Sequence, residues 1–127
     1  MIEPIWLDKE AVMAFHEAQL REHGGLGGIR DESGLDGALA RPLQLFHYEK
    51  TDLCALAAAY AHGIAKSHSF NDGNKRTALA SAIVFLEVNG IEATFSEPKA
   101  IEVMLGLASG KMSQKELADF FRGNTAR

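Results

Sequence analysis

A nine-residue stretch, from His68 to Arg76, gathers most of the side chains in this sequence that could do chemistry. It reads His-Ser-Phe-Asn-Asp-Gly-Asn-Lys-Arg, and the apolar run from Ala78 to Leu86 that follows has Ser81 as its single polar residue. Because no Gly or Pro occurs again before Gly90, the run predicts a helix buried on most of its circumference. The polar stretch would then stand at the amino end of that helix, where free N–H groups and the helix dipole favour anions.

The residue types in this stretch suit the handling of phosphate groups. Gly73 permits a sharp turn and a close approach of the backbone to a ligand. Asn74, Lys75 and Arg76 offer donors for phosphate oxygens, with Arg76 providing a planar fork and Lys75 a point charge. Asp72 is a hard oxygen ligand of the kind that Mg²⁺ takes beside substrate phosphates. Together they predict a site for a small phosphorylated ligand.

Two further residues complete the predicted site. His68 can accept a proton near neutral pH, which suits the activation of a hydroxyl group. Phe70, the one large apolar side chain of the stretch, is expected to anchor the loop in the core. Simpler interpretations exist, with Asp72 as a helix N-cap, the basic pair as solvated charges and His68 as structural. They explain the cluster less well, because capping needs one Asp or Ser and not His, Asp, Gly, Asn, Lys and Arg within nine positions.

The stretch resembles the signature of the Fic/Doc family, H-x-F-x-[DE]-[GA]-N-[GK]-R, and is most similar to its Doc-like branch, the death-on-curing toxins of toxin–antitoxin pairs. All six fixed positions are matched, by His68, Phe70, Asp72, Gly73, Asn74 and Arg76. Lys75 stands where Doc-like members carry Lys and adenylylating Fic enzymes usually carry Gly. The length and the Gly-rich region before the core are also Doc-like, so the resemblance covers most of the chain.

This resemblance implies both a fold and an activity. The fold would be all-α, a Fic-type bundle of about six helices with the motif loop between two central helices. The activity would be transfer to a hydroxyl of a target protein, with ATP as co-substrate and Mg²⁺ bound at Asp72. Lys75 is associated with a nucleotide placement that presents the γ-phosphate, which favours a kinase with elongation factor Tu as target and translation arrest as outcome. AMP transfer remains an alternative because Gly73 is also Fic-like, and an inactive Fic-like binding module is another; a metal hydrolase would need more ligands than the stretch offers.

The resemblance also implies a protein partner. Many Fic proteins carry a self-inhibitory helix with the pattern [ST]-x-x-x-E-[GN], which this sequence lacks. The family's alternative is a small antitoxin whose disordered C-terminal segment folds as a helix into a groove near the active site. We therefore expect such an antitoxin.

Composition bounds the remaining function classes. The 127 residues carry a net charge of −4 and no block of Lys and Arg, so direct binding to nucleic acid is not expected. No run of 18 or more apolar residues and no secretory signal are found, and Cys54 is the sole cysteine. These features favour one domain spanning residues 1–127, located in the cytoplasm, with Cys54 buried.

The elements that position the motif can be sketched from caps and breakers. The first half predicts a helix from Asp8 to about Glu22, an ordered Gly-rich loop, a short helix over 33–41 stopped by Pro42, and a loop over 43–50. That loop would either cover the core or form a flap over the active site. A helix capped by Thr51 and rich in small residues over 53–65 should pack closely on the helix of 78–86.

The sequence after Gly90 predicts a short extended piece over 91–95 and a helix from Ser96 to about Ala108. Ser113 with Glu116 forms the pattern of a capping box that opens a last helix. Residues 123–127 are expected to fray.

Overall fold

The computed structural model describes residues 2–127, which form six α-helices and one two-stranded antiparallel sheet. The helices are α1 (Lys9–His23), α2 (Glu32–Tyr48), α3 (Leu53–Ser67), α4 (Asn74–Val88), α5 (Glu97–Ser109) and α6 (Gln114–Gly123). The strands are β1 (Glu92–Ala93) and β2 (Thr125–Ala126). The predicted all-α bundle, with the motif loop between two central helices, is confirmed.

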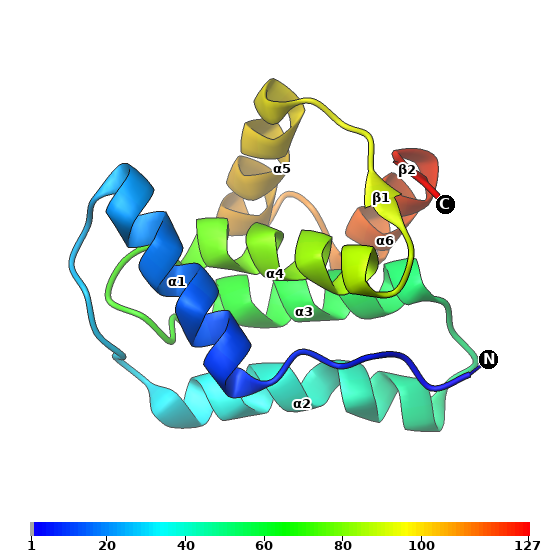
Figure 1. Ribbon diagram of the computed structural model, residues 1–127, viewed down its shortest axis with the longest axis horizontal. Coiled ribbons are helices and arrows are strands. Elements are labelled where there is room, and N and C mark those ends of the chain that lie inside the picture. The colour runs from blue at the N-terminus through cyan, green and yellow to red at the C-terminus, as the bar shows by residue number, and fades with distance from the viewer. Residues whose placement is uncertain (1) are drawn as a thin grey trace.

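Helix α3 lies at the centre of the bundle. Figure 1 shows it between α2 and α4, with α1 crossing α4 and α6 packed against α3 from the other side. Ten residues of α3 are buried, and several are alanines with no exposed surface. Small side chains let neighbouring backbones approach, as where Gly63 of α3 lies against Ala38 of α2. The motif loop leaves the carboxyl end of this rigid helix and enters α4, so both of its ends are fixed.

Helix caps distinguish α4 from the other helices in residues 2–127. A side-chain oxygen of Asp8, Asp31, Asp52, Ser96 or Ser113 accepts a hydrogen bond from a first-turn N–H of each of the other five. The predicted caps at Asp8 and Ser96 and the capping box of Ser113 and Glu116 are confirmed. The N-cap position of α4 is occupied by Gly73, which has no side chain to cap the helix. Its first N–H groups are therefore left for another partner.

The prediction that a helix stops at Pro42 is wrong, because α2 continues to Tyr48 with Pro42 inside it. Proline removes one backbone hydrogen bond and disfavours the helical conformation of the residue before it. Here Leu35, Ala38 and Pro42 are all buried, and the burial of that face offsets the cost. The loop expected over residues 43–50 is consequently helical as far as Tyr48, and it forms no flap.

Two smaller predictions are also corrected. Asp52, and not Thr51, caps α3, since its carboxylate accepts from the backbone N–H of Ala55. The C-terminal segment does not fray as predicted, because Thr125 and Ala126 pair with Ala93 and Glu92 in the small sheet. The predicted extended piece after Gly90 supplies β1, the partner strand. None of the helices in residues 2–127 combines the length and apolar character that a membrane span requires.

Candidate functional site

His68 occupies the C-cap position of α3 with an exposed side chain. Its backbone is left-handed, at φ 50° and ψ 42°, and it is the one non-glycine residue with positive φ in residues 2–127. A non-glycine residue in this region costs on the order of 1 kcal/mol or more, and such residues cluster at functional sites. The imidazole is thus accessible from solvent.

The amino end of α4 presents backbone donors beside two cations. Gly73 adopts φ 80°, and the first intrahelical bond runs from the N–H of Thr77 to its carbonyl. The N–H groups of Asn74, Lys75 and Arg76 precede that bond and have no partner in the helix. The side chains of Lys75 and Arg76 are exposed. This end of α4 can therefore accept an anion through both N–H groups and charges.

The side chain of Asn74 braces the motif loop. Its Oδ1 accepts from the N–H of Phe70 at 3.0 Å, and its Nδ2 donates to the carbonyl of Phe70 at 2.9 Å. Phe70 itself is 1% exposed. Any contact of Asn74 with a phosphate would therefore come from its backbone N–H.

Asp72 is exposed next to this helix end, and its carboxylate does not cap α4. Instead, Oδ2 accepts from the backbone N–H of Leu26 at 2.7 Å. This contact excludes the interpretation of Asp72 as a simple N-cap. One fixed, exposed carboxylate fits the way Mg²⁺ binds in phosphate sites, through one or two carboxylates with substrate phosphates and water as further ligands.

The Gly-rich connection between α1 and α2 forms the wall against which the motif loop rests. The carbonyl of Ser69 accepts from the N–H groups of Arg30 and Asp31, at 2.7 and 3.0 Å. Asn71 bonds the same connection twice, through its N–H to Gly28 and through its Nδ2 to Gly27. In Figure 1 these two loops lie side by side at one end of the molecule. The connection is ordered, as its interleaved apolar residues predicted.

His16 belongs to the site, and sequence reasoning missed it. The imidazole is 4% exposed, and its Nε2 lies 2.7 Å from the carbonyl oxygen of Asp72. It also stacks on the ring of Phe70, with centroids 3.8 Å apart and an angle of 10° between the planes. The available signal was its place four residues after Val12, on the buried face of the first helix. A polar residue on such a face needs a buried partner, but the sequence does not say which one.

A groove of about 600 Å³ opens beside the amino end of α4. One end is polar and is lined by Asp72, Gly73, Lys75 and Arg76, with Gln19 of α1 nearby. The other side is lined by residues of α5 that are apolar except for Glu97, and among them Ile101 and Leu105 are 49% and 60% exposed. His68, Phe70 and Asn74 are not among the groove-lining residues. The structure thus brings four of the predicted site residues to one groove wall and keeps His68 exposed at the start of the same loop.

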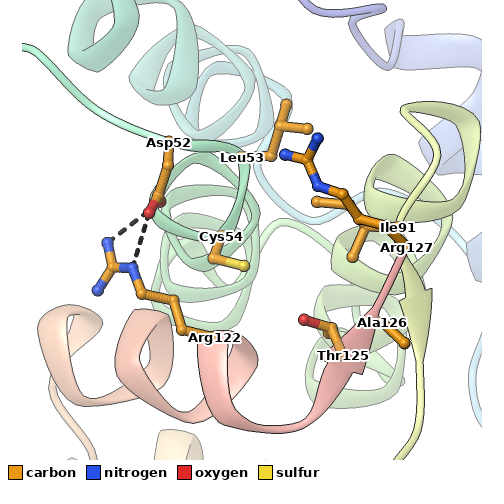
Figure 2. Close-up of a pocket in the computed structure, with 8 residues that line it drawn as sticks. All are labelled: Asp52, Leu53, Cys54, Ile91, Arg122, Thr125, Ala126 and Arg127. Carbon is orange, nitrogen blue, oxygen red and sulfur yellow. Dashed lines mark hydrogen bonds and ion pairs between the residues drawn. The ribbon is translucent and has the colours of Figure 1, made fainter.

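A second pocket, of about 260 Å³, lies at the opposite end of α3, around Asp52 and Cys54 (Figure 2). Figure 2 shows Arg122 of α6 paired with Asp52. Nε of Arg122 donates to Oδ2 of Asp52 at 2.8 Å, and Nη2 donates to Oδ1 at 3.1 Å. Cys54 is buried there, as predicted, and burial raises the pKa of its thiol. Helix α3 has 15 residues and so spans about 22 Å, which separates this pocket from the motif loop.

Comparison with known proteins matches the same part of the chain. A family model described as "Fic/DOC family" matches residues 6–86, which include α1 to α3, α4 as far as Leu86, and the whole motif. "Protein kinase doc" of Escherichia phage P1 is 37% identical over 117 residues, which cover 91% of this chain and 92% of the relative. "Toxin Doc" of Mycolicibacterium smegmatis is 36% identical over 110 residues, covering 82% and 81%.

Proposed function

The chain belongs to the Fic/DOC family, and we propose that it is a toxin-type transferase that phosphorylates a hydroxyl of a target protein from ATP. The observation that carries this proposal is the uncapped amino end of α4, with Lys75 and Arg76 exposed beside it. The exposed Asp72 and His68 precede it in the same loop. The names of the two relatives, one a protein kinase and one a toxin, support the same activity.

Phosphate binding would rest on the first turn of α4. The free N–H groups of Asn74, Lys75 and Arg76 donate to phosphate oxygens, and the guanidinium of Arg76 adds a fork of donors. Phosphoryl transfer relies mainly on positioning and charge stabilisation, and these groups supply both. Asp72 would hold Mg²⁺, which neutralises phosphate charge when bound.

His68 would act as the general base. Its imidazole takes the proton of an incoming hydroxyl while the hydroxyl oxygen forms a bond to the γ-phosphorus. The bond between that phosphorus and the β–γ bridging oxygen breaks, and ADP leaves. The exposure of His68 at the end of α3 supports this role, because the acceptor belongs to another protein and must approach from solvent.

The target and its setting follow from the family resemblance. We propose elongation factor Tu as the target, arrest of translation as the outcome and the cytoplasm as the location. AMP transfer to a protein hydroxyl is the alternative, and it differs in which phosphorus of ATP is attacked.

A two-label experiment tests the proposal. Purified protein is incubated with Mg²⁺, elongation factor Tu and ATP carrying label in either the α- or the γ-phosphate. We expect label in elongation factor Tu from γ-labelled ATP alone. His68→Ala should lower the transfer rate about 10²- to 10⁴-fold. His47→Ala, which changes an exposed histidine on α2, should keep the full transfer rate. Labelling from the α-phosphate would show that the protein is an adenylyltransferase and not a kinase. Nucleotide binding without any transfer would leave a binding module.

We also propose that the apolar side of the groove receives the helical C-terminal segment of an antitoxin. Ile101 and Leu105, four residues apart on α5, expose the kind of surface that an amphipathic helix covers. A segment lying there would also reach the polar end of the groove and so obstruct the phosphate site. This arrangement would let one partner both bind the protein and inhibit it.

Growth of cells that co-express the protein with the antitoxin from a neighbouring reading frame tests this partner. Ile101→Glu with Leu105→Glu should stay toxic and escape neutralisation, because the charges would have to be buried under the bound helix. Tyr48→Glu, at an exposed apolar residue of α2 outside this groove, is the matched control and should remain neutralised. Neutralisation of the double α5 variant would place the antitoxin elsewhere.

A further inference from the structure

The buried histidine of α1 makes contacts that converge on one residue of the proposed metal site. His16 bonds the backbone carbonyl of Asp72, while the carboxylate of Asp72 is held by the backbone N–H of Leu26. Both partners come from α1 and the connection that follows it. Asp72 is therefore fixed at its backbone and at its side chain by one segment distant in sequence.

The direction of the His16 bond defines the state of its ring. A carbonyl oxygen can only accept, so Nε2 of His16 must carry the hydrogen that is shared across 2.7 Å. The ring is simultaneously stacked on Phe70, the apolar anchor of the same loop. A Cβ placed on Gly73 would lie 3.5 Å from Cδ2 of His16, so the ring also packs against the turn that opens α4. One side chain thus contacts three residues of the motif.

We propose that His16 is a positioning residue that sets the orientation of the Asp72 carboxylate and the turn at Gly73, and thereby the affinity of the site for Mg²⁺. The inference rests on the proposed function, since Mg²⁺ binding at Asp72 is part of it. His16 is too buried to touch a nucleotide or an acceptor hydroxyl. It acts through Asp72, in the way that groups behind a metal ligand commonly change metal affinity or activity by about 10- to 100-fold.

Two substitutions separate the hydrogen bond from the packing. His16→Phe keeps an aromatic ring against Phe70 and removes the donor to Asp72. His16→Gln gives up the stacking but places an amide N–H near the position of Nε2. We expect His16→Phe to raise the Mg²⁺ concentration for half-maximal γ-phosphate transfer about tenfold or more, with an unchanged KM for the protein substrate. His16→Gln should return the Mg²⁺ requirement most of the way to that of the wild type.

Val12→Ala is the matched control for loss of stability. Val12 is fully buried on the same face of α1, one helical turn before His16. Its truncation should lower the unfolding midpoint and leave the Mg²⁺ requirement of the folded protein unchanged. If His16→Phe behaves like Val12→Ala, or if His16→Gln restores nothing, His16 is only a core residue and the inference is wrong.

A measurement without nucleotide distinguishes failure of this inference from failure of the proposed function. The N–H of Leu26 is bonded to the Asp72 carboxylate, so its hydrogen exchange reports whether that carboxylate is held. When the exchange rates are compared at conditions of equal global stability, the N–H of Leu26 should exchange faster in His16→Phe than in Val12→Ala. In His16→Gln it should again exchange slowly. If the wild type transfers no phosphate, the proposed function is wrong, and this exchange pattern still supports or overturns the positioning role.

Discussion

At the scale of single residues, His68 combines an unfavourable backbone with a useful side chain. Its left-handed conformation is one that glycine adopts at little cost and other residues do not. Nothing in helix termination requires histidine there, since glycine ends α5 in the same conformation at Gly110. The strained backbone at His68 has an explanation if the imidazole side chain is needed at this position as a base.

This leads to a comparison of His68→Gly with His68→Ala. Both should lose about 10²- to 10⁴-fold in transfer rate, because neither has a base. His68→Gly should be more stable towards urea than His68→Ala by about 1 kcal/mol, because alanine retains the cost of positive φ. Unfolding followed by circular dichroism measures the difference. An alanine variant as stable as the glycine variant would mean that the backbone at this position is not strained.

Asn74 illustrates a motif residue whose side chain is structural. Asn74→Ala removes two hydrogen bonds and leaves the N–H and carbonyl of Phe70 without these partners. We expect a loss of about 1–3 kcal/mol in the free energy of unfolding, measured by urea titration. Asn71→Ala, which removes one exposed bond to Gly27, is the control and should lose less than about 1 kcal/mol. Equal losses would show that the bonds to Phe70 do not brace the loop.

At the scale of elements, the turn into α4 depends on a glycine for its backbone and not for space. Gly73 has φ 80°, but an added Cβ would meet its nearest neighbour, the ring of His16, at an ordinary 3.5 Å. Gly73→Ala should therefore cost about 1–2 kcal/mol through its backbone conformation and retain transfer activity. Gly37→Ala, on the exposed face of α2 with open space around it, should instead stabilise by about 0.5–1 kcal/mol. Loss of activity in a folded Gly73→Ala protein would show that the ligand needs the space.

The same scale shows what the sequence could predict. Helix boundaries marked by a local chemical signal, such as Asp8, Ser96 and the capping box at Ser113, were predicted correctly because a cap acts within one turn. The helix through Pro42 was not, because burial of α2 against α3 outweighs a local penalty. The pairing of β2 with β1 was missed for a similar reason, since its partner lies more than 30 residues earlier.

The same distinction between local signals and long-range contacts applies to the candidate site. The motif that contains His68 and Asp72 is contiguous, so its residue types and spacing were visible in the sequence. The contacts that hold it are not contiguous: His16 lies 56 residues from Asp72, and Leu26 lies 46 residues away. No periodicity relates positions so far apart, and the packing of α1 on α4 and of the following connection on the motif loop brings them together.

At the scale of the whole molecule, the charged residues of the candidate site and the Asp52–Arg122 ion pair lie at opposite ends of α3. The motif loop follows its carboxyl end, whereas Asp52 caps its amino end and is paired with Arg122 of α6. The hydrogen bond from Arg122 lowers the pKa of Asp52, and burial opposes that shift. This pair should therefore affect stability and its dependence on pH without affecting transfer.

The sign of the pH dependence follows from the lowered pKa. A carboxylate whose pKa is lower in the folded than in the unfolded protein stabilises the fold above its unfolded value of 3.8. That contribution disappears as the pH falls through the folded pKa. The pair is partly exposed, so we expect only about 0.5–1 kcal/mol from it at pH 7.

A double-mutant cycle of Asp52→Asn and Arg122→Gln isolates this contribution, since Arg122 also bonds Asp119. Urea unfolding should give a coupling free energy of about 0.5–1 kcal/mol at pH 7. This coupling free energy should decrease below pH 4. The rate of γ-phosphate transfer at pH 7 should equal that of the wild type in all variants. A coupling free energy of the same non-zero size at pH 7 and pH 3 would mean that Asp52 stays charged across that range. A coupling free energy of zero at both would mean that Asp52 and Arg122 are not paired. A fall in transfer rate would mean that the two ends of α3 are coupled, because the cap at its amino end would then influence His68 about 22 Å away through the length of the helix.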